Sequence, residues 1–402
     1  MSGIIIVGAG QAGASLAAKL RALGYQGALT IIGEEPVPPY QRPPLSKAYL
    51  LGEMELERLF LRAPGYWQEQ AVELRLGQRV EAIDPSAKTI TVGGEVLAYD
   101  QLALTTGSRP RNLPDAIGGA LGNVFTVRTL ADVDRMAPHV RKGARAVIVG
   151  GGYIGLEAAA VAAKLGLNVT LIEAAPRILQ RVASPETSAY FRKLHQDHGV
   201  TILEGTGLER LLGDKDVTAV RLSDGRELPA DIVIVGIGIL PNSELAEAAG
   251  LVLDNGICTD AEGRTSDPAI WSAGDCASFP WAGGRIRLES VGNAIDQAEL
   301  VAANMLGAGR AYEAKPWFWS DQYDVKLQIA GLNTGYDQIV TRAGEGASVS
   351  FWYYRDGRLL AVDAMNDGRA YMIGKRMVEA GKSPAPEAVA DPATDLKALL
   401  TA

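Results

Sequence analysis

The chain has 402 residues, and 47% of them are hydrophobic, which is enough material for more than one buried core. Its formal net charge of −8 argues against nucleic acids and anionic membranes as partners. No apolar run reaches the roughly 18–20 residues that a membrane-spanning helix needs, and the N-terminus does not read as a signal peptide. These features predict a cytoplasmic protein of two or three domains.

The first elements of the chain predict a dinucleotide-binding unit. A buried strand is expected over residues 4–7, and an Ala- and Leu-rich helix ends at about residue 23. The turn between them carries Gly8, Gly10 and Gly13. In such a turn the first glycine permits the bend, the second lets a pyrophosphate approach the backbone, and the third lets the helix pack on the strand. A second strand over 28–32 ends near Glu34, where an acid binds the ribose hydroxyls of an adenosine.

The same pattern returns in the middle of the chain. A strand is expected over 146–149 and a helix ends at about residue 165. The turn between this second pair carries Gly150, Gly152 and Gly155. The next strand, 168–172, leads to Glu173. Two complete units in one chain predict an α/β protein with two Rossmann-like folds.

Two further strands indicate how the folds are connected. One is expected over 100–107, before the second glycine turn, and one over 230–238, after it. This order predicts that the second fold is inserted into the first. The chain then leaves the first fold near Pro110 and returns near Pro241, and it supplies Asp275 at a strand end beside the first cofactor.

The last part of the chain has a different pattern. Two strands over 351–354 and 359–363 flank an Asp-Gly turn at 356–357, which is typical of an antiparallel hairpin. A small sheet domain is therefore expected from about Tyr312 onward.

The cysteines and histidines do not indicate a disulfide framework or a metal site. Cys258 and Cys276 form no C-x-x-C pair, so both are interpreted as small structural residues. Three histidines could not easily supply a zinc site, and they are interpreted as surface or structural residues. They are His139, His195 and His198.

Four sequence motifs carry a resemblance to a known family. They are P-Y-Q-R-P-P-L-S-K at 39–47, G-G-G-Y-I-G-L-E at 150–157, G-D-C-A at 274–277 and P-W-F-W-S-D-Q-Y at 316–323. Over nearly its whole length the chain resembles the NADH-dependent ferredoxin reductases of bacterial oxygenase systems, in the two-dinucleotide flavoprotein superfamily that includes glutathione reductase. The disulfide reductases of that superfamily have redox cysteines after the first ribose acid. The stretch from Glu34 to Leu61 has no cysteine, so thiolate chemistry is disfavoured.

The resemblance implies an enzyme with FAD and NADH as cofactors and no metal. NADH would give a hydride to the flavin, and electrons would then pass singly to a [2Fe-2S] ferredoxin. That ferredoxin would supply a cytochrome P450 or a ring-hydroxylating dioxygenase. A rubredoxin reductase carries the same motifs, and a redox-sensing flavoprotein like apoptosis-inducing factor is an alternative of another class. The protein is expected to be a monomer or a weak dimer.

The resemblance also implies site residues and domains. Lys47 beside the flavin and Glu157 near the nicotinamide are the expected catalytic residues. For FAD, the resemblance implies Gly8, Gly10, Gly13 and Glu34. It also implies a further set for FAD: Ala12, Arg42, Lys47, Val80, Thr106, Gly107, Arg128, Asp275, Val291 and Trp319. For NADH, it implies Gly150, Gly152 and Gly155 and, in addition, Tyr153, Ile154, Glu157, Glu173, Arg181, Gly236 and Ile237. The expected domains are an FAD domain of residues 1–110 and 241–311, an NAD domain of 111–240, and a C-terminal domain of 312–402 that covers the flavin.

Four of these residues have ordinary structural alternatives. Lys47 and Glu157 could be a solvated lysine and a helix-surface glutamate. Asp275 could be a helix N-cap. Trp319 could be a core tryptophan.

A docking surface for an acidic ferredoxin is also expected. The segment 369–382 carries four basic residues against Glu379 alone, a local excess that can steer an acidic partner. The basic residues are Arg369, Lys375, Arg376 and Lys382. The alternatives are a solvated helix face with no partner, or a surface around Arg58 and Arg62.

Overall fold

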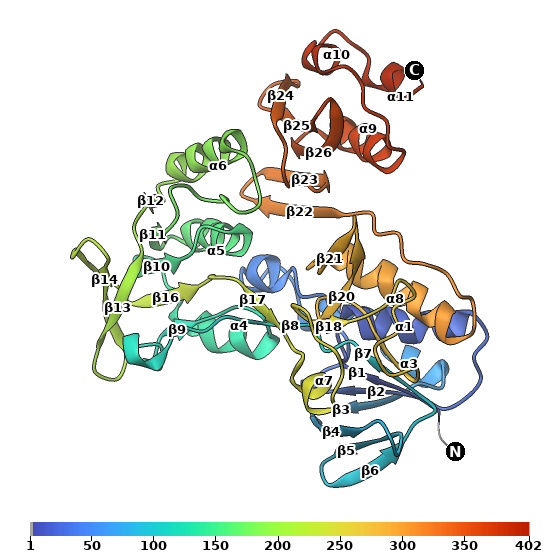
Figure 1. The fold of residues 1–402 in the computed structure, drawn as a ribbon. Helices are drawn as coiled ribbons and strands as arrows, with labels where there is room; N and C mark the ends of the chain where they lie inside the picture. Colours follow the sequence, from blue (N-terminus) through green and yellow to red (C-terminus); the bar gives the residue numbers. More distant parts are fainter. Residues whose placement is uncertain (1–2, 402) are drawn as a thin grey trace. The chain divides into compact units, whose positions relative to one another are not determined.

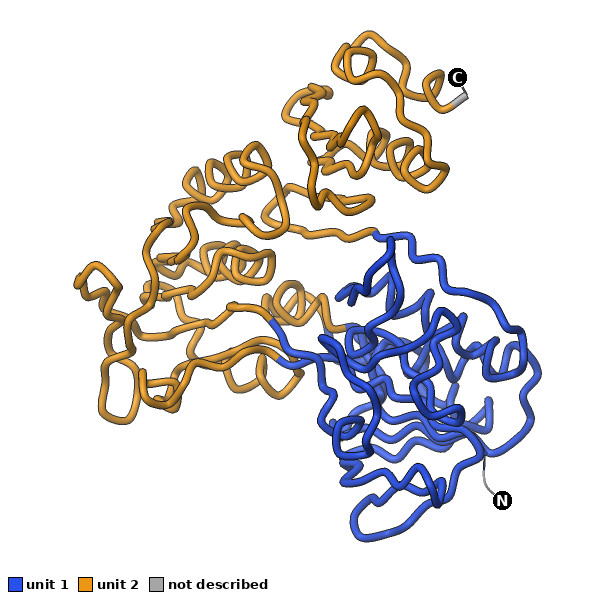
Figure 2. The backbone as a smooth tube through the Cα atoms, in the orientation of Figure 1, with its two compact units in different colours: residues 1–41, 55–109, 239–316 blue, residues 42–54, 110–238, 317–402 orange. Residues whose placement is uncertain are grey.

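The structure is a computed structural model that describes residues 3–401. Figure 2 shows its two compact units. Unit 1 comprises residues 1–41, 55–109 and 239–316, and unit 2 comprises residues 42–54, 110–238 and 317–402. Each unit contains one of the two expected glycine turns. The division into three domains stays a prediction.

A five-stranded parallel sheet forms the centre of unit 1. Its strand order is β19 (Ile270–Ser272), β7 (Gln101–Leu104), β1 (Ile4–Val7), β2 (Leu29–Gly33) and β3 (Glu73–Leu76). Successive side chains of β1 point to opposite faces, so Ile4 and Ile6 pack in one core and Ile5 and Val7 in another. Helices α1 (Gln11–Ala22) and α8 (Val291–Met305) contribute to the first of these cores (Figure 1).

Smaller elements complete unit 1. The helices are α2 (Leu56–Leu59), α3 (Tyr66–Glu69) and α7 (Glu244–Ala248). Strands β4 (Val80–Asp84), β5 (Thr89–Val92) and β6 (Glu95–Ala98) form an antiparallel sheet. Strands β18 (Ile257–Cys258), β20 (Ala277–Trp281) and β21 (Gly284–Ile286) form a mixed sheet, in which β18 is parallel to β20 and β21 is antiparallel to it. Strands β8 (Ser108–Pro110) and β17 (Ile239–Pro241) pair where the chain leaves and re-enters this unit.

Unit 2 contains a second five-stranded parallel sheet. Its order is β12 (Thr201–Glu204), β11 (Asn168–Glu173), β10 (Arg145–Val149), β16 (Ile232–Val235) and β9 (Val124–Phe125). Helices α5 (Tyr153–Lys164) and α6 (Pro185–Asp197) pack in the core on one face, and β13 (Leu208–Gly213), β14 (Val217–Leu222) and β15 (Glu227–Pro229) pack in the core on the other. Helix α4 (Leu130–Met136) follows β9, and short helical turns lie at Leu45–Tyr49, Asp115–Ile117 and Ala137–His139.

The C-terminal part of unit 2 is an antiparallel sheet with helices. The strand order is β22 (Trp317–Gln322), β23 (Val325–Gly331), β26 (Arg358–Met365), β25 (Val349–Arg355) and β24 (Gln338–Ala343). The predicted hairpin is present as β25 and β26, and both of its turn residues, Asp356 and Gly357, have positive φ as a two-residue turn requires. Helices α9 (Gly368–Glu379), α10 (Pro386–Ala390) and α11 (Leu396–Thr401) follow. Among the described residues, no helix combines the length and the apolar character needed to span a bilayer.

Candidate functional site

The glycine turn of unit 1 leaves an open space at the start of α1. Gly8 has φ +115°, and a Cβ there would lie 2.2 Å from the carbonyl oxygen of Thr105 on the neighbouring chain segment. A Cβ on Gly13 would lie 2.0 Å from the carbonyl oxygen of Gly8, so the helix packs directly on the turn. A Cβ on Gly10 would meet nothing within 4 Å. The first and third glycines therefore serve packing, and the second faces open space.

The glycine turn of unit 2 has the same three properties. Gly150 has φ +105°, and its Cβ would lie 2.4 Å from the carbonyl oxygen of Gly236. The Cβ of an alanine at Gly155 would lie 2.0 Å from the carbonyl oxygen of Gly150, whereas one at Gly152 would have no atom of the described residues within 4 Å. The bend and packing roles predicted for the first and third glycines are therefore present in both folds, whereas the approach of a pyrophosphate to the second glycine stays a prediction.

Both open spaces have features that suit a pyrophosphate. Gly10 and Gly152 are the N-cap residues of α1 and α5, no side chain of residues 3–401 caps either helix, and neither first turn contains an acidic residue. The free N–H groups and the positive helix end therefore point at the space that each glycine leaves. The residues present fit one dinucleotide in each unit.

The acids expected to bind ribose differ between the units. Glu173 is half-buried, and its two carboxylate oxygens accept hydrogen bonds from the backbone N–H groups of Gly151 at 2.7 Å and Ala175 at 2.8 Å. Glu34 is 71% exposed and has one ion pair, to Arg79 at 3.4 Å. The acid next to it, which the sequence analysis did not select, is Glu35, and it accepts a 2.6 Å hydrogen bond from Tyr40.

The remaining residues implied for FAD in unit 1 lie near the carboxyl ends of its parallel strands. Thr106 and Gly107 follow β7, and Asp275 follows β19 and accepts a 2.8 Å hydrogen bond from Ser108. Ala12 lies on α1, where it packs on Gly274. Two residues belong to elements outside the parallel sheet: Val80 begins β4 and Val291 begins α8. Their contact with FAD stays a prediction.

The residues implied for NADH surround the corresponding sheet edge of unit 2. Gly236 and Ile237 follow β16, and the Arg181 guanidinium lies 3.7 Å from where a Cβ on Gly238 would be. Ile154, at the start of α5, is a large apolar side chain that is 45% exposed. Tyr153 packs its ring against Phe318, and its buried hydroxyl has no hydrogen-bond partner among the described residues. Their contact with NADH likewise stays a prediction.

Arg42 and Arg128, both implied for FAD, meet in unit 2. The Arg42 guanidinium donates a 2.7 Å hydrogen bond to the carbonyl oxygen of Arg128. The N–H of Arg128 donates to Asp132, whose carboxylate and the Thr129 hydroxyl form a capping box for α4. The backbone of Arg128 is thus held on both sides.

Lys47 and Glu157, the two expected catalytic residues, form an ion pair in unit 2. The Nζ–Oε1 distance is 3.0 Å, and the side chains are 17% and 8% exposed. Neither residue is therefore the solvated surface group that was the alternative. Burial raises the pKa of Glu157, and the Lys47 ammonium and the Ser320 hydroxyl oppose that rise. Lys47 departs from helical geometry inside its turn, with φ −131° and ψ −113°.

Two partners of this pair were missed in the sequence analysis. Ser320 donates a 2.6 Å hydrogen bond to Glu157, and Asp321 lies 3.8 Å from the Lys47 ammonium. Both belong to β22 and to the W-F-W-S-D-Q motif, whose polar residues the sequence analysis quoted without assigning them a role.

Trp319 lies in an aromatic group on β22. Its ring stacks on Trp317 at 5.5 Å and lies 6.4 Å from Phe318, and all three side chains are partly buried. Trp319 is therefore not a fully buried core residue, and its contact with FAD stays a prediction.

The described part of the chain contains no disulfide and no candidate metal site. Both cysteines are free; Cys276 is buried and Cys258 is half-buried. No cluster of His, Cys, Asp and Glu among residues 3–401 could hold a metal ion.

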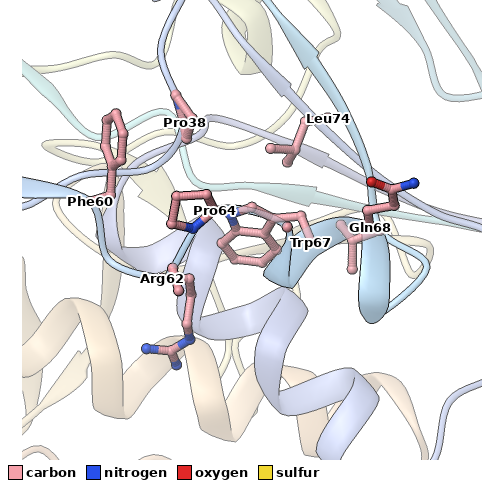
Figure 3. A pocket seen from close by; sticks show the side chains of 10 residues that line it. Pro38, Phe60, Arg62, Pro64, Trp67, Gln68 and Leu74 are labelled. Atoms are coloured by element: carbon pink, nitrogen blue, oxygen red, sulfur yellow. The ribbon is translucent and has the colours of Figure 1, made fainter. Parts of the chain in front are cut away.

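A surface pocket in unit 1 includes Arg62, a residue of the alternative docking surface. It has a volume of about 460 Å³ and is lined mainly by apolar side chains, among them Pro38, Phe60, Trp67 and Leu74, with Arg62 (Figure 3). None of the residues expected to bind a cofactor lines it.

Comparison with known proteins assigns the chain to a family. The pyridine nucleotide-disulphide oxidoreductase family matches residues 2–298, and the reductase C-terminal family matches residues 317–400. The chain belongs to the pyridine nucleotide-disulphide oxidoreductases. A ferredoxin–NAD(P)+ reductase of Sphingomonas sp. is 46% identical over 406 residues, covering 99% of this chain and 97% of that protein.

Two further relatives agree with this assignment. The ferredoxin–NAD+ reductase component of the anthranilate 1,2-dioxygenase system of Burkholderia cepacia is 41% identical, covering 98% of each chain. The crystal structure of a covalent putidaredoxin reductase–putidaredoxin complex matches with a TM-score of 0.96 at 41% identity, covering 100% of this chain and 98% of that one. The predicted family, fold class and oxidoreductase activity with FAD and a nicotinamide dinucleotide are confirmed.

Proposed function

We propose that the chain is an NADH:ferredoxin reductase that takes two electrons from NADH through FAD and gives them singly to a [2Fe-2S] ferredoxin of an oxygenase system. Each turnover would convert one NADH and two oxidised ferredoxins into NAD+, one proton and two reduced ferredoxins. Bound FAD would supply the step from two-electron to one-electron transfer. The buried Lys47–Glu157 ion pair carries this proposal.

The chain's own residues would hold the reactants and their charges. Lys47 would place a cation where negative charge develops on the reduced cofactor, and partial burial strengthens that interaction because little water screens it. Glu157 would keep the ammonium in place. Its position in the second turn of α5, the helix whose N-cap is Gly152, puts it on the element expected to bind the nucleotide in unit 2.

Glu173 supports NADH as the donor. Its carboxylate is fixed by two backbone N–H groups, so its free lone pairs can accept hydrogen bonds from both ribose hydroxyls. A 2′-phosphate would instead meet a like charge. The reaction would take place in the cytoplasm, where NADH is produced.

The absence of a suitable thiol supports an iron–sulfur acceptor over a disulfide. Both cysteines lie in unit 1: Cys276 is buried, and Cys258 follows Ile257 in a short strand. The segment after Glu34, where thiol-dependent relatives have their cysteine, contains none. Electrons would therefore leave without a covalent intermediate on the protein.

Fewer of the four basic residues of the expected docking surface are available to a partner than the sequence suggested. Three of its four cations have partners in unit 2: Arg369 pairs with Asp395, Lys375 with Glu379, and Lys382 donates to the carbonyl oxygen of Leu400. The remaining cation, Arg376, is exposed, and no partner of its side chain is found among residues 3–401. Exposed Met372 lies one turn away on α9. We propose Arg376 and Met372 as the contact region.

The choice of acceptor tests the proposal. Turnover with NADH should be much faster with a [2Fe-2S] ferredoxin than with rubredoxin, and Arg376→Glu should lower kcat/KM for ferredoxin several-fold while ferricyanide reduction stays normal. Equal or faster turnover with rubredoxin would favour that reductase class. A long-lived NADH-reduced form that turns over with neither acceptor would favour a redox sensor.

A further inference from the structure

A row of buried polar side chains in unit 2 begins at Glu157 and is not used by the proposed reaction. Ser320 donates to Glu157 at 2.6 Å, and the Gln322 amide nitrogen donates to the Ser320 hydroxyl at 3.1 Å. The Gln322 carbonyl oxygen lies 2.8 Å from Nε2 of His195, and the hydroxyl of Tyr323 lies 3.3 Å from Nδ1 of the same ring. Ser320, Gln322 and His195 are at most 1% exposed.

Three elements bring these residues together. Ser320 and Gln322 are two positions apart on β22, so they share one face of the strand. Glu157 comes from α5 and His195 from α6, the two helices in the core on one face of the parallel sheet. Tyr323 follows β22 and stacks on His198, which is exposed, with ring centroids 3.7 Å apart. The row therefore runs from the buried ion pair to the surface.

The charge on Glu157 fixes the direction of every hydrogen bond in the row. An ionised carboxylate only accepts, so the Ser320 hydroxyl must donate to it and must itself accept from the Gln322 amide nitrogen. The amide carbonyl then faces His195, so that ring must carry a proton on Nε2. Its Nδ1 is left as the acceptor for the Tyr323 hydroxyl.

The state of the His195 ring allows this arrangement. Burial lowers the pKa of His195 to about 4, against the opposing effect of its hydrogen bond to Gln322 and with a smaller lowering by His198. The ring is therefore neutral near pH 7 and carries a single N–H, so its two tautomers are distinct states. Besides Gln322, the Tyr323 hydroxyl lies within hydrogen-bond distance of the ring, and His198 is the titratable neighbour that acts on the ring through its charge.

We propose that His195, Gln322 and Ser320 are positioning residues for Glu157, and that the tautomer of His195 reports whether that carboxylate is charged. Three aligned donors favour the ionised form of Glu157 in a buried site, which keeps its attraction for Lys47. Loss of the charge would let the row reverse, with Gln322 donating to the ring and the ring proton on Nδ1. The hydrogen-bond relay itself does not depend on the proposed function. Only the role of the Glu157 charge in holding Lys47 beside the cofactor rests on that function.

Nitrogen NMR of the FAD-loaded, oxidised protein tests the proposal. The chain has three histidines, so ¹⁵N-histidine labelling gives three rings, assigned with His139→Gln and His198→Gln variants. The wild type should show His195 with Nε2 protonated. Ser320→Ala does not alter a residue that contacts His195, yet it should shift the tautomer ratio toward Nδ1–H by about fivefold, the equivalent of one hydrogen bond of about 1 kcal/mol. Ser320→Thr keeps the hydroxyl and should restore the ratio.

A matched control separates this relay from general loosening of the sheet. Ser350 on β25 is also fully buried and bonds Trp352 instead, so Ser350→Ala should leave the His195 tautomer unchanged. Glu157→Gln, which breaks the row at its other end, should shift the ratio as Ser320→Ala does. A His195 spectrum that neither variant changes, or an Nδ1–H tautomer in the wild type, would overturn the proposal. None of these results depends on ferredoxin turnover, so failure of the proposed function would be seen separately.

Discussion

The two dinucleotide folds have the same glycine geometry but differ in their acids. In unit 1, Gly33 occupies the register position at the end of β2 that Glu173 occupies at the end of β11, as the pairing of each strand with its neighbour shows. A Cβ on Gly33 would lie 2.5 Å from the Ala9 methyl group, whereas the matching neighbour of Glu173 is Gly151, whose N–H binds the carboxylate. The methyl group of Ala9 thus excludes an acid at this position, and Glu34 follows one residue later.

This difference indicates that the two sites select their ligands differently. An acid held by two backbone N–H groups has a fixed orientation, so it can discriminate between a hydroxyl and a phosphate on the same ribose. Glu34 is exposed and has a single long ion pair among the described residues, so the orientation of its carboxylate is weakly fixed. Under the proposed assignment of NADH to unit 2, this fold is the one that distinguishes NADH from NADPH.

Substitutions at the glycines should have the largest effects, and they test the geometry that the two folds share. Gly155→Ala forces a Cβ to 2.0 Å from a carbonyl oxygen and should destabilise the protein by about 1–3 kcal/mol or more. Gly152 has φ −79° and ψ 179°, which valine adopts freely, and faces open space. Gly152→Val should therefore keep the wild-type Tm while the Kd for NAD+ rises by at least about 100-fold. Calorimetry of both variants checks this, and an unchanged Kd for Gly152→Val would show that the dinucleotide binds elsewhere.

The acids provide the next largest effect. Glu173→Ala should raise the KM for NADH by about 10- to 100-fold, because hydrogen bonds to a charged group contribute about 1.5–3 kcal/mol. It should also erode the preference over NADPH. Glu34→Ala should change FAD retention by less than about fivefold, since an exposed ion pair contributes about 0–1 kcal/mol. Steady-state kinetics and FAD titration measure the two changes, and equal sensitivity of the two sites would refute the contrast drawn here.

The cysteines should give the smallest effect. Cys258→Ser and Cys276→Ser remove the only thiols in the chain, and neither is placed in the redox chemistry. NADH-to-ferricyanide activity should stay within about twofold, although Cys276→Ser, in a fully buried position, should cost about 1 kcal/mol of stability. Loss of FAD reduction by NADH in either variant would mean that a thiol takes part.

Local sequence signals were sufficient to predict both glycine units. The helix expected to end at about residue 23 ends at Ala22, and the strand expected over 168–172 extends to Glu173. Periodicity, glycine spacing and turn chemistry are all properties of neighbouring residues, so they can be recognised in one sequence. The difference between Ala9 and Gly151 was also visible, but its effect on the acid requires the strand register.

Contacts between distant segments could not be predicted in this way. Residues 42–54 belong to unit 2, where pairs such as Glu53 with Lys164 join segments more than a hundred positions apart. The row from Glu157 to His195 has the same origin, because β22 places Ser320 and Gln322 beside two helices from the middle of the chain. Its histidine was interpreted as structural, since a lone histidine in a sequence gives no sign of its partners.

The stoichiometry of anaerobic electron transfer tests the central claim most directly. FAD-loaded protein would be mixed with limiting NADH and an excess of oxidised [2Fe-2S] ferredoxin, and both absorbance changes would be followed to completion. The account predicts two ferredoxins reduced for each NADH consumed, over many turnovers, with NADPH at least about 100-fold slower at equal concentration. Consumption that stops at one NADH per FAD, with the ferredoxin still oxidised, would contradict it.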